Sequence, residues 1–170
     1  ARLDFEQALL LRERARGATA REVAQSLAGL AASHLDAGDL AGALALFERA
    51  LQIRQIRNGP RAPETAQAMN NVAAVLRLTG DNARAAGLLT HAIRIWERTK
   101  GPDHPHVAQA LENLAAVYRA LGQPSRARPL LSRALSIKEH TLGAAHPSLA
   151  DTLDVVADVA RLEGRLDDAD

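Results

Sequence analysis

Side-chain amides and guanidinium groups recur along this chain at a spacing of 42 residues, and they are the groups with which it could bind a ligand. The recurring rows are Gln25, Gln67 and Gln109; Asn71 and Asn113; and Arg77, Arg119 and Arg161. Because an Asn or Gln side chain both donates and accepts hydrogen bonds, a ladder of amides can pair with the backbone of an extended peptide. For the Asn row, amides that satisfy neighbouring helix ends are the alternative. For the Arg row, ligand contact and salt bridges to acids such as Asp158 or Glu112 both stay open.

Residues that could catalyse a reaction do not form a recognised constellation. The sequence has no Cys, which excludes disulfides, thiol catalysis and thiolate metal ligands. Ser148 lies near His146, but no third group orients the pair, and no phosphate-binding loop is present. His104 and His106 could hold a metal only if another ligand converged, and we expect His104 and His146 to begin helices instead. The sequence therefore predicts a protein that is not an enzyme and uses no metal or cofactor.

The spacing of 42 residues also relates small residues along the whole chain. The glycine columns are Gly17, Gly59, Gly101 and Gly143, and Gly38, Gly80, Gly122 and Gly164. Two alanine columns are Ala31, Ala73, Ala115 and Ala157, and Ala8, Ala50, Ala92 and Ala134. A fixed period of this length is typical of stacked repeat proteins, whose extended concave surfaces are usually binding surfaces.

Each repeat reads as two helices. In the unit 61–101, apolar residues recur at helical spacing from Met69 to Leu76, and Gly80 then breaks the pattern. A second apolar run ends near Trp96, which we expect to be a partly exposed packing residue. The predicted helices are 2–16 (a partial second helix), 20–37, 40–57, 63–79, 82–99, 105–121, 125–141 and 147–163, with another helix beginning at 167–170.

Composition excludes several function classes. Hydrophobic residues make up 47% of the 170 residues but aromatic residues only 2%, so Ala, Leu, Val and Ile must build the core. The net charge of +1 gives no bulk field that would favour nucleic acid or an anionic membrane. No apolar run approaches the roughly 18 residues that span a bilayer, and no signal peptide is visible. We therefore expect a cytoplasmic protein with no membrane partner.

The columns resemble the tetratricopeptide repeat (TPR), in the 42-residue form found in kinesin light chains and many bacterial proteins. Small residues stand where the two helices of that repeat cross, here also in the column Ala43, Ala85, Ala127 and Ala169. A large apolar residue of the second helix is matched by Phe5, Phe47, Leu89 and Leu131. Two local motifs are similar as well, the Leu-Asn-Asn-Leu-Ala-like segments 69–73 and 111–115 and the His-Pro helix starts at 104–105 and 146–147.

The resemblance implies an all-α fold, a right-handed superhelical solenoid of antiparallel helix pairs. It implies a single solenoid domain over residues 1–170. Its repeats are expected at about 1–17 (second helix only), 18–59, 60–101, 102–143 and 144–170 (first helix and the start of the second).

A helical wheel of the first helix in each pair separates two faces. Met69 and Leu76 point one way, whereas Gln67, Asn71 and Arg77 point roughly the opposite way. The resemblance implies that this second face lines a concave groove. The candidate groove residues are Gln25, Gln67, Asn70, Asn71, Arg77, Gln109, Glu112, Asn113, Arg119, Asp151, Asp154, Asp158 and Arg161.

The function expected from these features is that of a non-catalytic scaffold that binds an extended peptide or partner segment in the groove. The sequence does not identify the partner. Asp151, Asp154 and Asp158 make one end of the groove acidic, so a basic residue or an amino terminus of the ligand is the natural complement there. The resemblance to kinesin light chains implies recognition of tryptophan-plus-acidic peptides through basic groove residues, but the acidic end of the present groove does not fit that specificity.

An alternative function is that of a structural or regulatory solenoid arm of a larger signalling protein. Leu3, Phe5 and Leu9 would leave an apolar terminal repeat, and end-to-end contacts between such repeats would lead to self-association. Nucleic-acid binding is not expected. Packed helices lie about 8–10 Å apart, so equivalent helices of neighbouring repeats lie roughly twice that distance apart. This spacing is too wide for the Arg row to contact successive phosphates of a nucleic acid. One Tyr and one Trp cannot form the platforms on which bases stack.

Overall fold

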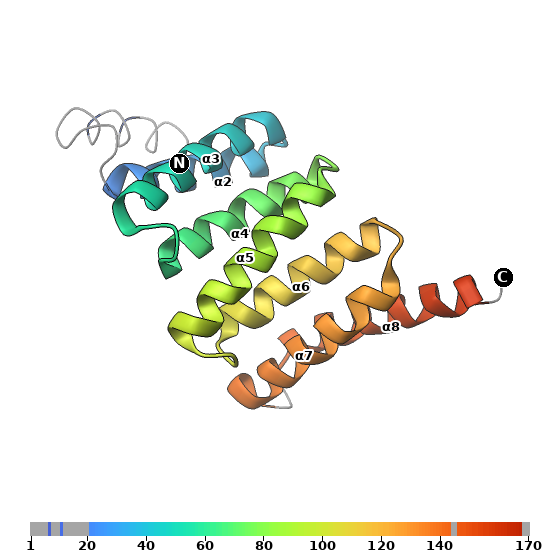
Figure 1. The fold of residues 1–170 in the computed structure, drawn as a ribbon. Coiled ribbons are helices and arrows are strands. Elements are labelled where there is room, and N and C mark those ends of the chain that lie inside the picture. Colours follow the sequence, from blue (N-terminus) through green and yellow to red (C-terminus); the bar gives the residue numbers. More distant parts are fainter. Residues whose placement is uncertain (1–6, 8–10, 12–20, 144–145, 168–170) are drawn as a thin grey trace. The chain divides into compact units, whose positions relative to one another are not determined.

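The structure is a computed structural model that describes residues 7, 11, 21–143 and 146–167 (Figure 1). Within the described residues, the chain forms seven helices and no strand. The helices are α2 (Arg21–Asp36), α3 (Leu40–Asn58), α4 (Pro63–Leu78), α5 (Asn82–Lys100), α6 (Pro105–Ala120), α7 (Pro124–Leu142) and α8 (Ser148–Asp167). The predicted bounds of α2 to α7 agree with these to within one residue. The expected helix 2–16, with its apolar Leu3, Phe5 and Leu9, lies outside the described residues.

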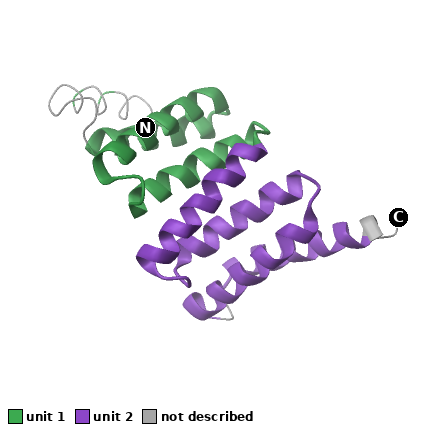
Figure 2. Cartoon of the chain, in the orientation of Figure 1, with its two compact units in different colours: residues 1–81 green, residues 82–170 purple. Residues whose placement is uncertain are grey.

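Contacts divide the chain into two compact units, residues 1–81 and residues 82–170 (Figure 2). The division falls between α4 and α5, inside the repeat expected at 60–101. In the first unit α3 packs against both α2 and α4, and in the second unit α6 packs against both α5 and α7, while α7 also packs against α8. Helices that are adjacent in sequence therefore pack together in each unit. A single solenoid domain over 1–170 stays a prediction.

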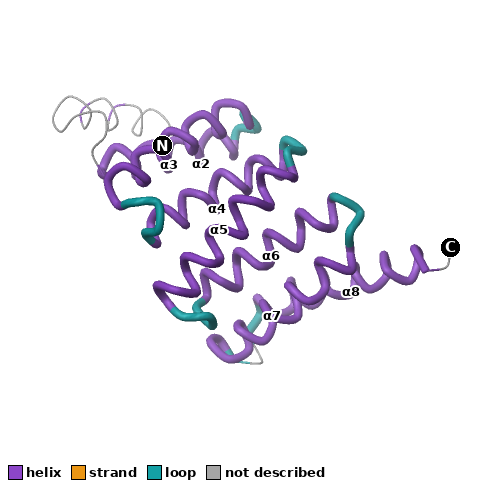
Figure 3. The backbone as a smooth tube through the Cα atoms, in the orientation of Figure 1, coloured by secondary structure: helices purple, strands orange, loops and turns teal. Residues whose placement is uncertain are grey.

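The ends of the helices follow from local sequence, and short turns join them (Figure 3). Helices α4, α6 and α7 each begin with Pro, whose fixed φ suits the first helical position and whose missing N–H has no partner there in any case. Asp39 caps α3, since its Oδ1 accepts a 2.9 Å hydrogen bond from the Gly42 N–H. Gly80 and Gly122 follow helices with φ of 86° and 67°, a conformation that other residues rarely adopt.

Gly164 does not end its helix, so the prediction of a break there is wrong. Helix α8 continues through Gly164 to Asp167 as one element. Glycine permits a left-handed turn but does not impose one, and it costs only about 1 kcal/mol inside a helix. Gly80 is followed by Asp81, a poor helix former, whereas Gly164 is followed by Arg165 and Leu166, which are good ones.

The core consists of the columns that the sequence predicts. Ala43, Ala85 and Ala127 are each 0% exposed, which lets neighbouring helix backbones approach closely. The large apolar column of the second helix is buried beside them, at Phe47, Leu89 and Leu131. None of the helices in the described part of the chain is long and apolar enough to cross a membrane.

Trp96 is fully buried, and the expectation of a partly exposed residue is wrong. Its ring packs against the ring of His106 from the next helix, with centroids 5.1 Å apart and planes inclined by 51°. In the same column the first unit has Arg54, whose side chain is half-buried. The large indole is buried at this position because α6 supplies an aromatic partner for it.

Candidate functional site

Helices α2, α3 and α4 of the first unit surround a cavity of about 150 Å³. Five of its nine lining residues are apolar, four of them alanines, and the other four are polar or charged. The lining residues are Ala24, Ala28, Phe47, Ala50, Arg54, Glu64, Gln67, Ala68 and Asn71. Two of the predicted groove residues, Gln67 and Asn71, therefore lie at one cavity.

Gln67 and Asn71 also bond to each other. Gln67 Nε2 donates a 3.1 Å hydrogen bond to Asn71 Oδ1, one turn further along α4. Both side chains are half-buried. The bond uses one N–H of Gln67 and the carbonyl of Asn71, so it leaves Gln67 Oε1 as an acceptor and Asn71 Nδ2 as a donor. The pair thus offers one acceptor and one donor at the cavity, which is the complement of a peptide unit.

Asn70 does not lie on this surface, and its predicted place on the exposed face of the helix is wrong. Its side chain is 4% exposed. Nine of the 16 residues of α4 are buried, so the buried face of this helix is wider than the apolar face that the helical wheel predicts. Asn70 follows Met69 by 100° around the helix, which places it inside that wider face.

Glu112 is taken up by contacts within the second unit. Its Oε1 forms an ion pair with Lys138 of α7 and accepts a 2.5 Å hydrogen bond from Thr152 Oγ1 of α8. Lys138 Nζ in turn lies 2.9 Å from Thr152 Oγ1. The lysine and glutamate side chains are 17% and 26% exposed. Three helices thus converge on one largely buried polar cluster, and Glu112 belongs to it.

Two members of the Arg row, Arg119 and Arg161, show the internal pairing that was one of the two alternatives for this row. Arg119 Nη1 lies 3.7 Å from Asp158 Oδ2, and Arg161 pairs with the other oxygen of the same carboxylate. These side chains are between 37% and 70% exposed, so the pairs contribute at most about 1 kcal/mol. Arg77, the first member of the row, is half-buried near the end of α4.

The other predicted groove residues lie on three helices. Gln25 and Gln109 are exposed, and Asn113 is half-buried. Asp151 and Asp154 are exposed on α8, one turn from each other, so this helix carries an acidic surface as expected. Whether any of these residues contacts a ligand stays a prediction.

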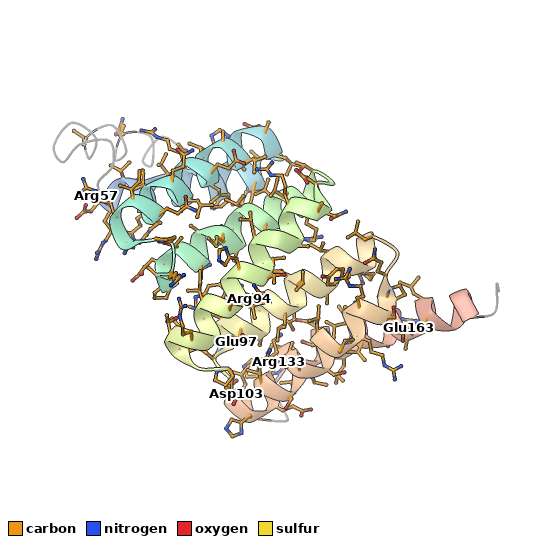
Figure 4. The ribbon with its side chains drawn as sticks, in the orientation of Figure 1. Arg57, Arg94, Glu97, Asp103, Arg133 and Glu163 are labelled. Atoms are coloured by element: carbon orange, nitrogen blue, oxygen red, sulfur yellow. The ribbon has the colours of Figure 1, made fainter. Side chains whose placement is uncertain are left out.

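The surface of the second unit contains further ion pairs (Figure 4). Arg133 of α7 pairs with Glu97 of α5, with Nη1 and Oε1 2.7 Å apart, and also donates a 3.2 Å hydrogen bond to the carbonyl of Pro102. Arg128 of α7 lies 3.4 Å from Glu163 of α8. These contacts join neighbouring helices, so they serve the fold.

His104 and His146 begin helices, as predicted. His104 Nδ1 accepts a 3.1 Å hydrogen bond from the His106 N–H, and His146 Nδ1 accepts a 3.2 Å one from the Ser148 N–H. The 2.8 Å contact between His146 Nδ1 and Ser148 Oγ is part of the same helix start. Burial, followed by the charge of Lys100, lowers the pKa of His104.

Sequence comparison assigns the family. Residues 23–64 and residues 64–140 match models of the tetratricopeptide repeat, and the chain belongs to that family. A comparison with curated protein sequences finds no match. Tetratricopeptide repeats generally mediate protein–protein interactions and are generally not enzymes.

Solved structures share the fold at low sequence identity. BtubC (BKLC) from P. vanneervenii is 22% identical with a TM-score of 0.84, over 94% of this chain and 64% of that protein. The nearly identical TPR-like repeats of a candidate kinesin light chain from Podosopora anserina are 23% identical with a TM-score of 0.81, over 99% and 80%. The N-terminal domain of STI-1 from C. elegans is 19% identical with a TM-score of 0.58, over 84% and 96%. The fold is therefore an all-α helical repeat solenoid. The chain spans less than two thirds of the length of BtubC.

Proposed function

We propose that this chain is a non-catalytic interaction module that holds an extended segment of a partner protein along its A helices, which are α2, α4, α6 and α8. The observation that carries the proposal is the bonded pair Gln67–Asn71 beside the cavity of the first unit. The pair keeps one acceptor and one donor for a ligand, and these match the N–H and C=O of an extended backbone.

The wall of the cavity supports the same proposal. Ala24, Ala28 and Ala68 are small, so a chain can approach the amide pair closely. Hydrogen bonds to the backbone of the ligand would provide affinity, and the cavity beside the amide pair can accept one ligand side chain and so provide specificity. In the second unit, exposed Asp151 and Asp154 on α8 favour a ligand that carries a basic residue or an amino terminus.

The experiment that tests the proposal is affinity capture from a lysate of the source organism. The bait is the wild type, the double variant Asn71→Ala/Asn113→Ala, or the control variant Gln52→Ala, which removes an exposed amide from α3. The wild type and the control should retain a partner that the double variant loses, with equal helical circular dichroism and melting temperatures. If all three baits retain the same partners, binding through the amide rows is wrong.

A second function, self-association, is favoured by one observation on α8. Ala31, Ala73 and Ala115 are at most 1% exposed, whereas Ala157 in the same column is exposed, and Leu153 beside it is 49% exposed. A second copy of the chain that covered this face would bury both residues. Light scattering over a range of concentrations should then give a rising mass that Leu153→Arg abolishes. A constant monomer mass would exclude self-association.

A further inference from the structure

We infer that the cavity between α2, α3 and α4 is a subsite for an acidic side chain of the bound segment, with Arg54 as its counter-ion. The inference rests on the proposed function, because it names the side chain that enters the cavity while the backbone lies on the amide pair. It follows from a comparison between the two units of the same chain.

Three positions of the cavity have counterparts two repeats further along. Ala28 corresponds to Glu112, Arg54 to Lys138 and Ala68 to Thr152. In the second unit these counterparts form the buried cluster in which Glu112 accepts from both other side chains. In the second unit, the space that corresponds to the cavity is therefore filled by a carboxylate that lies between a cation and a small polar group.

The first unit has the cation without the carboxylate. Arg54 lines the cavity and is half-buried, and it makes no ion pair with any residue that the structure describes. Ala28 and Ala68 are small, so the volume that Glu112 and Thr152 occupy in the second unit is empty here. A partly desolvated cation beside an empty volume favours an anionic group, and a guanidinium group binds a carboxylate in a bidentate way.

The size of the cavity suits a glutamate side chain. A cavity of about 150 Å³ is large enough for a group the size of benzene. The methylene groups of a glutamate would pack against Ala24, Ala50 and Phe47, while its carboxylate meets Arg54. Asn71 Nδ2 carries two N–H groups, so one can meet the ligand backbone while the other is a further donor to the carboxylate at the same wall.

In the intervening repeat, other side chains stand at the positions of Arg54 and Glu64. There the counterpart of Arg54 is Trp96 and the counterpart of Glu64 is His106. These two side chains stack on each other, and Trp96 is fully buried. The unpaired cation is therefore a feature of the first unit and not of every repeat.

Glu64 is the other charged residue of the cavity, and it opposes an acidic ligand. Its side chain is exposed, so solvent screens its charge, and it lies in the first turn of α4, where the helix dipole stabilises a carboxylate. Neutralising it should strengthen binding of an acidic side chain. The substitution Glu64→Gln is thus expected to tighten binding by about threefold.

The test uses a positional-scanning library of amidated nonapeptides as the probe. The wild type should enrich Glu over Gln at one position by about tenfold. Ala28→Glu supplies the carboxylate from within the protein, as Glu112 does, and should abolish that preference. Ala28→Gln fills the same volume without a charge and should lose the preference as well, as should Arg54→Met, whereas Gln52→Ala, an exposed residue of α3 outside the cavity, is the control and should keep it. All variants must show wild-type circular dichroism and melting, and the cluster at Glu112 indicates that this fold accepts a glutamate at that position.

The outcomes separate this inference from the proposed function. If the wild type binds nonapeptides and Asn71→Ala abolishes that binding, but no position prefers Glu, the acidic subsite is wrong and the proposed function stands. An equal preference for Glu in wild type and Arg54→Met also overturns the subsite. If the wild type binds no nonapeptide, the proposed function fails and the subsite fails with it.

Discussion

Lys138 of α7 forms an ion pair with Glu112 of α6, and Thr152 of α8 donates a 2.5 Å hydrogen bond to the same carboxylate. Three consecutive helices of the second unit therefore meet at one charge. Because the two charged side chains are only 17% and 26% exposed, the loss of either partner leaves a poorly solvated charge behind.

The first prediction concerns this cluster. Glu112→Gln should lower the free energy of unfolding of the second unit by about 1–3 kcal/mol, because Lys138 is then left without a counter-ion. The control is Glu163→Gln, which removes an ion pair to Arg128, a side chain that is 66% exposed, and should cost less than about 1 kcal/mol. Urea unfolding monitored by Trp96 fluorescence measures both. Equal costs for the two variants would contradict the structural role of the cluster.

Trp96 provides the second prediction. It is the single Trp of the chain and is fully buried, so its emission should be blue-shifted in the native state and move to the red on unfolding. Trp96→Ala should destabilise the second unit by about 3–5 kcal/mol, since it removes the largest buried side chain and leaves a hole. Calorimetry measures the loss. A native emission typical of exposed indole would show that Trp96 is not buried.

The third prediction tests the close crossing of helices in the first unit. Ala43→Leu should destabilise it by about 1–3 kcal/mol, because Ala43 is 0% exposed and the core has no room for a larger side chain. Ala45 is exposed on the same helix, so Ala45→Leu is the control and should change stability by less than about 0.5 kcal/mol. Thermal unfolding followed by circular dichroism distinguishes them. A stable Ala43→Leu variant would mean that the crossing is looser than the structure shows.

The fourth prediction is a pH dependence. Burial lowers the pKa of His106 below its ordinary value of 6.5, and the charges of His104 and Lys100 lower it further. The unfolded chain therefore binds protons at a higher pH than the folded chain. The free energy of unfolding should decline as the pH falls below about 6.5, and level off below the lowered pKa.

The variant His106→Phe keeps an aromatic ring beside Trp96 but cannot be protonated. Its stability should fall less steeply between pH 7 and pH 5 than that of the wild type, while His104 retains part of the dependence, because the pKa of His104 is lowered as well. Urea midpoints across this pH range give the comparison. Parallel curves for the two proteins would contradict the role of His106.

Local sequence predicts the helices of this fold well, because prolines, glycines and apolar spacing act within single elements. It does not predict features that depend on several helices at once. Trp96 is buried because His106 stands on the next helix, and Asn70 is buried because α4 has a wide buried face. The cavity at Arg54 is formed by residues 24 to 71 from three helices, and comparison of Ala28 with Glu112 in the sequence is the one signal that could have indicated it.

The central claim is that the amide pair of α4 contacts a bound backbone. The most direct measurement is an NMR titration of the isotopically labelled protein with the nonapeptide that binds best, following the side-chain amide signals of Gln67, Asn71 and Gln52. We predict that the signals of Gln67 and Asn71 shift and saturate together, while that of Gln52 on α3 stays in place. Saturating shifts at Gln52, with Gln67 and Asn71 unchanged, would contradict the claim and assign binding to the second helices.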